Sequence, residues 1–184
     1  LLDYLTRSEN AAVAIRQQIE FTKEYENIGS SVPVWHDVSA LVASARGQLD
    51  LDDVTLEDEV TGLSIYADPM FVKIITHLID NAVRHGGPGI TRIRFSGSVT
   101  PDGYLLVCED DGAGIPKKDK AAIFRRVIGV DTKIGLFLMQ EVLALTMIMV
   151  RETGEPGRGA RFELTVPPGA YRVAAGDVIE DLFE

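Results

Sequence analysis

The sequence predicts an α+β protein: a two-layer sandwich in which a mixed, mostly antiparallel sheet is covered on one face by helices. Three observations lead to this prediction. Short segments alternate apolar and polar residues, longer segments repeat apolar residues at helical spacing, and the strand-like segments come in pairs with helices between them. A helical arm is expected to precede this domain.

The arm covers residues 1–28, which are polar, rich in helix-forming residues and free of glycine and proline. Apolar and small residues there follow a spacing of three and four, which predicts a weak coiled-coil or bundle seam. Gly29 and Pro33 then break the helix. We therefore expect an arm over residues 1–30, a globular domain over 31–170 and an acidic tail over 171–184.

The elements of the domain are predicted from turn residues and from the period of the apolar positions. In chain order we expect a strand over 32–38, a helix over 38–49, strands over 53–60 and 63–68, a helix from Asp68-Pro69 through His85, strands over 91–100 and 104–110, a short helix over 117–124, a helix over 135–146, and strands over 147–153 and 160–167.

Three of these boundaries have a specific physical reason. The side chain of Asp37 can cap the first turn of the helix that follows it. Pro69 is tolerated in the first turn of a helix. Thr61-Gly62 separates two alternating segments, which predicts that they pair as a hairpin.

Composition limits the class of partner. The net charge of −10 repels nucleic acid and anionic membranes, and no basic cluster offsets it. The one cysteine, Cys108, cannot build a disulfide framework, which fits a reducing compartment. No apolar run is long enough to span a bilayer, so we expect no membrane contact by this segment. Because the chain begins at Leu1 in mid-pattern, we interpret it as a fragment of a longer protein.

Polar residues gather on one side of the helix that ends at His85. At 100° per residue, His77, Asn81 and Arg84 fall opposite the apolar face, with His85 at its edge. Solvent-facing surface explains any one of them. Together they indicate a site, because an asparagine oxygen suits Mg²⁺ and an arginine fork can grip a phosphate.

Two glycine motifs follow along the chain. Asp110, Gly112 and Gly114 form an Asp-x-Gly-x-Gly sequence after a predicted strand. Alternate glycines let the backbone approach a flat ligand, and the carboxylate can accept a hydrogen bond from the amine of adenine. Taken alone, this motif is better explained as a plain Asp-Gly turn. Gly135 begins a helix whose free amides attract phosphate.

In this order, the motifs resemble the ATP-binding catalytic domain of sensor histidine kinases, within the GHKL ATPase superfamily. The resemblance covers about residues 32–168, and the short span before Gly135 is similar to the abbreviated ATP lid of some archaeal sensor kinases. The motifs are Asn81 in an Asn-Ala-x-x-His helix, the Asp110 box, Phe124 in "AIFRR", the Gly135-Leu136 helix start and the Gly157-x-Gly159 loop.

The resemblance implies ATP and Mg²⁺ as cofactors and assigns roles to residues. Asn81 would hold Mg²⁺ as a catalytic residue, and His77 would orient a phosphate or a water. Phe124 and Leu138 are further candidates for apolar contact with the base, although core packing is an equal alternative. The nucleotide-binding residues would be Asn81, Arg84, His85, Asp110, Gly112, Gly114, Ile115, Lys133, Gly135 and Leu136.

The sequence departs from the family pattern at three positions. His77 stands where the kinases commonly have asparagine and the hydrolytic relatives have glutamate. Without that glutamate no side chain there would activate water, which argues against the chaperone, topoisomerase and mismatch-repair members. Lys133 replaces a lid glycine and limits backbone freedom there, and Ala160 stands where serine or threonine is frequent.

Two functions follow from these residues. In the first, the chain is the ATP-binding catalytic domain of a two-component sensor histidine kinase, and residues 1–30 are the truncated second helix of a dimerisation and phosphoacceptor hairpin. It would transfer the ATP γ-phosphate to a histidine outside this chain, because His36 lies in a predicted strand. Its partners would be that acceptor domain, a response regulator and a second copy of the parent protein, which would be cytoplasmic or anchored to a membrane. In the second, His77 and Lys133 mark a degenerate, non-catalytic GHKL-like dimerisation module with a vestigial nucleotide site.

Overall fold

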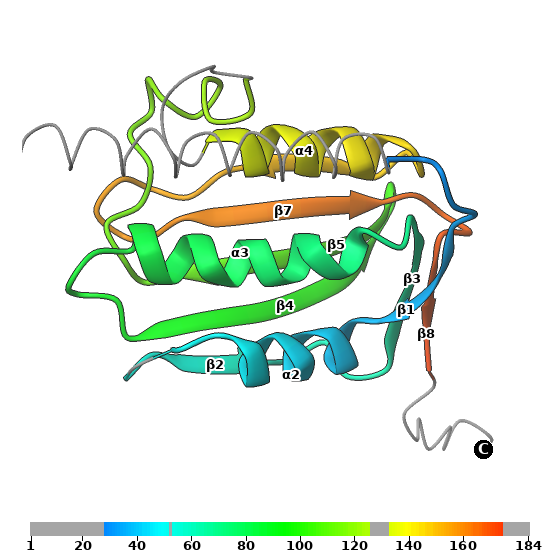
Figure 1. Cartoon of the computed structure of the whole chain (residues 1–184), viewed down its shortest axis with the longest axis horizontal. Coiled ribbons are helices and arrows are strands. Elements are labelled where there is room, and N and C mark those ends of the chain that lie inside the picture. Colours follow the sequence, from blue (N-terminus) through cyan, green and yellow to red (C-terminus); the bar gives the residue numbers. More distant parts are fainter. Residues whose placement is uncertain (1–27, 52, 126–132, 175–184) are drawn as a thin grey trace, which may run out of the picture.

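The computed structural model describes residues 28–51, 53–125 and 133–174, with side chains in the last range described from Leu136 onward. The described chain forms two layers, a sheet and a set of helices that cover one of its faces (Figure 1). Within these ranges the helices are α2 (Val38–Gln48), α3 (Phe71–His85) and α4 (Lys133–Ala144). No helix in the described ranges is long and apolar enough to cross a membrane.

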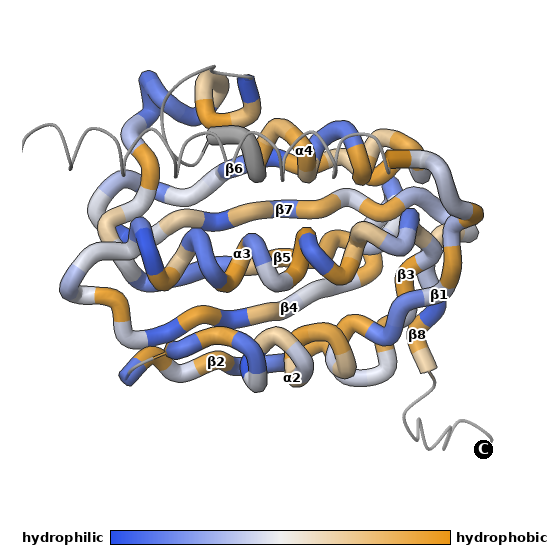
Figure 2. The backbone as a smooth tube through the Cα atoms, viewed as in Figure 1, coloured by the Kyte–Doolittle hydropathy of each residue, from blue (hydrophilic) through white to orange (hydrophobic). Residues whose placement is uncertain are grey.

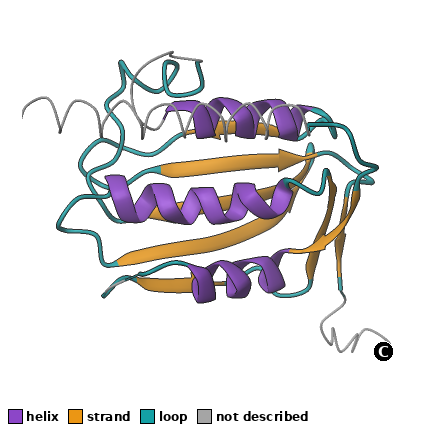
Figure 3. Cartoon of the chain, viewed as in Figure 1, coloured by secondary structure: helices purple, strands orange, loops and turns teal. Residues whose placement is uncertain are grey.

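The larger sheet has the strand order β2-β4-β5-β7-β6, and all its neighbours are antiparallel except the parallel pair β2 and β4. A smaller antiparallel sheet, β1-β3-β8, stands at one end of it (Figure 3). The predicted α+β sandwich, mixed and mostly antiparallel with helices on one face, is confirmed. The strands are β1 (Val34–Asp37), β2 (Thr55–Asp58), β3 (Leu63–Ala67), β4 (Arg92–Thr100), β5 (Gly103–Asp110), β6 (Met149–Glu152), β7 (Arg161–Val166) and β8 (Tyr171–Val173).

The core lies between the helices and the larger sheet. Figure 2 shows apolar and polar residues alternating along α3 and along the strands behind it. Ile75 and Ile79 of α3 are fully buried in one cluster with Phe95 of β4 and Leu106 of β5. Burying such side chains contributes about 1.5–3 kcal/mol each. This packing places the polar carboxyl-terminal end of α3 beside the ends of β5 and β7.

Side chains alternate along each strand, and on the opposite face of the sheet a charged cluster lies around Glu109. Glu109 on β5 accepts hydrogen bonds from Arg94 on β4 and from Arg161 on β7. Burial would by its own effect raise the pKa of Glu109, but the hydrogen bonds and charges of the two arginines together lower it below its usual value. This part of the face is therefore a cross-strand network of paired charges rather than part of the core.

The predicted hairpin of residues 53–60 and 63–68 is wrong. β2 lies parallel to β4, with Leu56 opposite Ile93, whereas β3 pairs with β1 and β8 in the other sheet. The turn between them exists, and its Gly62 has a φ of +78°. Alternation predicts which face of a strand is buried but not which strand it pairs with, and the two segments join different sheets.

Two further segments differ from the prediction. Residues 117–124 form successive turns instead of a helix, and the carbonyl of Asp119 accepts from the amides of Ala122 and Ile123. This segment is held by contacts to the turn between β6 and β7 and not by the repeated hydrogen bonds of a helix. The strand β8 lies within the segment expected to be an acidic tail. With three residues, it is too short for an alternating apolar and polar pattern to identify it as a strand.

The predicted cap of α2 is confirmed, since Oδ1 of Asp37 accepts from the amide of Ala40 at 2.9 Å. Asp37→Ala is expected to lower the free energy of unfolding by about 1 kcal/mol, because the first turn loses an acceptor. Urea unfolding followed by circular dichroism measures this loss. Asp37→Asn keeps an acceptor and should recover most of it, and equal losses in both variants would contradict the cap.

Candidate functional site

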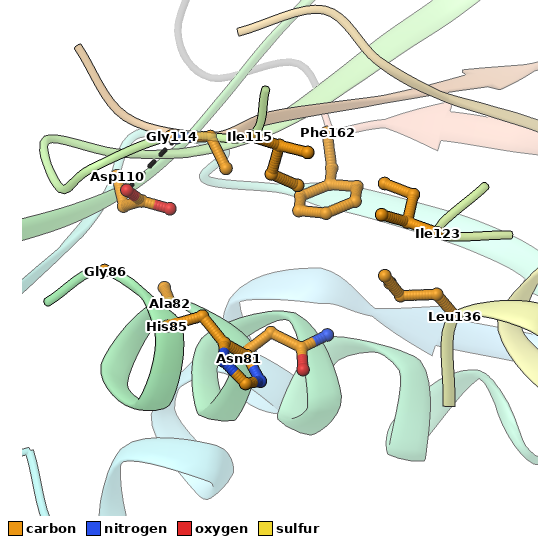
Figure 4. Close-up of a pocket in the computed structure, with 11 residues that line it drawn as sticks. Asn81, Ala82, His85, Gly86, Asp110, Gly114, Ile115, Ile123, Leu136 and Phe162 are labelled. Carbon is orange, nitrogen blue, oxygen red and sulfur yellow. Dashed lines mark hydrogen bonds between the residues drawn. The ribbon is translucent and has the colours of Figure 1, made fainter. Parts of the chain in front are cut away.

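A cavity of about 200 Å³ lies between the carboxyl-terminal half of α3 and the loops at the ends of β5 and β7 (Figure 4). Most of its wall is apolar, and three polar side chains reach it from two directions. Asn81 and His85 come from α3, and Asp110 comes from the end of β5 across the cavity. The remaining lining residues are Ala82, Gly86, Gly114, Ile115, Ile123, Leu136, Ala160 and Phe162.

Two backbone amides orient the carboxylate of Asp110. Its Oδ1 accepts from the amide of Gly112 at 2.9 Å and from the amide of Ala160 at 3.2 Å. Burial raises the pKa of Asp110 above its usual value, although these two hydrogen bonds oppose the shift. Both amides use Oδ1, so Oδ2 is the oxygen that can accept from a donor in the cavity.

Asn81 is a buried residue of α3, not a solvent-facing one. Only 9% of the residue is exposed, because α4 packs beside α3 and the loops above the cavity cover this side. Its Nδ2 is buried and has no hydrogen-bond partner among the described residues. An unsatisfied buried amide costs about 1–3 kcal/mol, and such groups are concentrated at functional sites.

The glycines of the box pack backbone against backbone. A Cβ on Gly112 would lie 2.5 Å from the Cα of Gly86, and a Cβ on Gly159 would lie 1.7 Å from the carbonyl oxygen of Asp110. Gly114 lines the cavity with a φ of +68°, a conformation that favours glycine. The structure therefore places Gly112 outside the lining, since the end of α3 occupies the space beside it.

Several other predicted residues also lie away from this cavity. The side chain of Arg84 is 65% exposed, and its Nε donates to Oδ1 of Asp80 at 2.7 Å on the outer side of α3. His77 and Leu138 line a separate cavity between α3 and α4. His77 lies one turn before Asn81, and Leu138 lies two residues after Leu136, on another side of α4. Phe124 packs edge-on against Phe162, with ring centroids 6.4 Å apart, behind the wall.

The start of α4 is only partly described. Lys133 and Gly135 fall in its first turn, and their side-chain surroundings lie outside the described residues. Leu136, one of the predicted nucleotide-binding residues, lines the cavity. Ile123, Ala160 and Phe162 were not assigned to the site, and the one signal for Phe162 was its place after the last glycine loop.

Residues 67–170, more than half of the chain, match the family described as histidine kinase-, DNA gyrase B-, and HSP90-like ATPase. The chain belongs to this ATPase family. The cavity described above lies within the matched residues, from Asn81 to Phe162. The resemblance to catalytic, ATP-binding domains of sensor histidine kinases is confirmed.

Named relatives of this ATPase domain are sensor kinases. The alginate biosynthesis sensor protein KinB of Pseudomonas aeruginosa is 32% identical over 100 residues, which are 52% of this chain and 17% of KinB. The sensor-like histidine kinase SenX3 of Mycolicibacterium smegmatis is 27% identical over 163 residues, which are 80% of this chain and 42% of SenX3. The chain thus spans less than half the length of these curated relatives.

Solved structures show the same fold at low identity. The ATP binding domain of PrrB from Mycobacterium tuberculosis has a TM-score of 0.60 and 23% identity, covering 74% of this chain and 98% of that domain. Full-length ShkA in complex with AMPPNP has a TM-score of 0.70 and 19% identity, covering 95% of this chain and 39% of ShkA.

Proposed function

We propose that this chain is the ATP-binding catalytic domain of a two-component sensor histidine kinase. The observation that carries the proposal is one cavity lined by Asn81 from one side and by Asp110 from the other. Family membership supports an adenine nucleotide as the ligand. The γ-phosphoryl group would pass to an imidazole nitrogen of a histidine outside this chain, leaving ADP.

We assign the adenine to the end of the cavity near Asp110. Oδ2 of Asp110 would accept from the exocyclic amine, and the ring would lie among apolar side chains such as Ile115 and Phe162. Guanine has a carbonyl at the position of that amine, so it would place one acceptor against another. A site built to receive a donor strongly rejects a ligand that lacks it.

We assign the phosphates to the α3 side of the cavity, across from Asp110 and near Asn81 and His85. The orphaned, buried amide of Asn81 fits a role as the neutral oxygen ligand of Mg²⁺ once it turns its oxygen toward the cavity. Mg²⁺, when bound, neutralises charge on the phosphate oxygens. Arg84 can join them at little cost, because its exposed ion pair with Asp80 is weak. Lys133, Gly135 and Leu136 would approach the phosphates from the start of α4.

Calorimetric titration with a non-hydrolysable ATP analogue and Mg²⁺ tests the first half of the proposal. Adding an isolated phosphoacceptor hairpin domain and labelled ATP tests the second, with label on histidine as the expected result. Binding without transfer would favour the degenerate dimerisation module instead. Failure of the wild-type chain to bind would overturn the nucleotide site itself.

The remaining partners follow from this function. We assign a response-regulator aspartate as the next phosphoryl acceptor and a second copy of the parent protein as the dimer partner. We assign the domain to the cytoplasm, because its substrate ATP is found there.

ATP binding is expected to weaken as the pH falls, and to do so at a higher pH than the usual pKa of an aspartate would predict. Burial, and to a lesser degree the charges of Asp111 and Glu152, raise the pKa of Asp110 in the free protein. The amine donates to the ionised carboxylate, so binding favours that form and releases a proton. Affinity is therefore full above the raised pKa and declines as the pH falls through it. Calorimetry in buffers of different ionisation enthalpy measures how many protons are released when ATP binds. If no proton is released in mildly acidic buffer, the assignment of Asp110 is contradicted.

A further inference from the structure

A buried ion pair joins two segments that are distant in the sequence. Lys120 lies in the turns between Gly114 and α4, and Glu152 is the last residue of the edge strand β6. The Nζ of Lys120 contacts Oε2 of Glu152 and also donates to the carbonyl of Gly154. The side chain of Glu152 has no exposed surface, and that of Lys120 is 21% exposed.

Glu152 also organises the turn between β6 and β7. Its Oε1 accepts from the amide of Gly154 at 3.0 Å and from the amide of Arg161 at 3.2 Å. Oε1 is thus held by two backbone amides, whereas Oε2 has no hydrogen-bond partner among the described residues and has Lys120 as its counter-ion. Removing the lysine would leave a buried charge without its counter-ion, which is strongly destabilising for the segments that hold it.

The same turn is attached to the Asp-x-Gly-x-Gly box. The amide of Gly157 donates to the carbonyl of Ala113 at 2.7 Å, and the amide of Ala160 donates to Oδ1 of Asp110 at 3.2 Å. These two hydrogen bonds hold the turn beside Asp110, and Lys120 ties a further segment to the turn.

The segment that Lys120 ties down carries part of the cavity wall. Ile123 follows Lys120 by three residues, is 8% exposed and lines the cavity. Its amide donates to the carbonyl of Asp119 at 2.9 Å, which closes the turn around Lys120. Phe124 then packs on Phe162. The position of this wall thus depends on a turn whose one buried ionic anchor, among the described residues, is Lys120.

We propose that the Lys120–Glu152 pair is a positioning latch, which holds the wall formed by Ile123 over the base of the bound nucleotide. The inference rests on the proposed nucleotide function. Neither residue lines the cavity, so both act through the wall and neither is catalytic. Through this latch, the edge strand β6 influences how tightly the cavity binds the adenine base.

Lys120→Met tests the latch, with Lys120→Arg as the rescue and Lys118→Met as the matched control, because Lys118 is an exposed lysine in the same turns. Lys120→Met is expected to weaken binding of AMPPNP with Mg²⁺ by about tenfold. Hydrogen exchange at the amides of Ala122 and Ile123 should become faster in the same variant. Lys120→Arg should restore both readouts, and Lys118→Met should match the wild type.

Each result decides the proposal. Unchanged exchange at Ala122 and Ile123 in Lys120→Met would overturn the latch. Faster exchange with unchanged nucleotide affinity would overturn its role in positioning the wall. If Lys120→Met does not fold, Glu152→Gln replaces it, since glutamine keeps one oxygen for the two backbone amides. If the wild type binds no nucleotide, the proposed function fails, and the exchange readout still decides whether the latch exists.

Discussion

Asp110→Asn is expected to raise the dissociation constant for ATP by about 100-fold, a loss of roughly 2.7 kcal/mol. Asparagine keeps an oxygen for the amides of Gly112 and Ala160, so the loop retains its hydrogen bonds. It replaces Oδ2 with an NH₂ group, which would meet the amine of adenine donor against donor. The lost pairing is buried, and a buried donor without an acceptor costs the full desolvation of the group.

The stability of the same variant separates binding from folding. Burial raises the pKa of Asp110, so the folded state disfavours the ionised carboxylate. The ionised carboxylate therefore lowers the stability of the fold once the pH rises above the pKa that this group has in the unfolded chain. At neutral pH Asp110→Asn should therefore melt no lower than the wild type. Asp111→Asn is the matched control, because Asp111 accepts from Thr91 and Arg92 and does not line the cavity.

Calorimetry with ATP and with GTP is the decisive measurement for Asp110. The wild type should prefer ATP, and Asp110→Asn should lose most of that preference because its NH₂ group can donate to the guanine carbonyl. Asp111→Asn should keep the affinity and the preference of the wild type. ATP binding of wild-type strength in Asp110→Asn would exclude Asp110 as the adenine-binding residue.

Asn81→Leu is expected to lower phosphoryl transfer by at least about 100-fold while making the domain more stable. The amide that would hold Mg²⁺ is lost, so the phosphates are no longer positioned. Leucine has a similar size, and it replaces a buried Nδ2 that has no hydrogen-bond partner among the described residues. The free energy of unfolding should rise by about 1–3 kcal/mol, because an unsatisfied polar group is removed from the interior.

Adenosine distinguishes the two ends of the cavity. It has the base but no phosphates, so Asn81→Leu should bind it as the wild type does, whereas Asp110→Asn should not. Thr76→Ala is the control on α3, because the hydroxyl of Thr76 bonds only to the carbonyl of Val72 in the described structure. Transfer at the wild-type rate in Asn81→Leu, measured as labelled acceptor histidine, would remove Asn81 from the mechanism.

Local sequence signals predicted much of the fold. The period of apolar residues predicted α3 and α4, and alternating segments at 91–100 and 104–110 predicted the strands β4 and β5. The failures have a common cause. β2 and β3 are adjacent in the chain, yet they pair with strands of different sheets, and partner choice depends on contacts far along the sequence.

The chemical groups of the site can be read from the sequence, because residue type and local spacing are properties of the chain itself. Asn81, Asp110 and the glycines of the Asp-x-Gly-x-Gly box were recognised in this way. Their surroundings are not local. The packing of α4 and the loops buries Asn81, and Gly86 fills the space beside Gly112. Burial and distance arise when segments dozens of residues apart pack together, so they emerged with the tertiary structure.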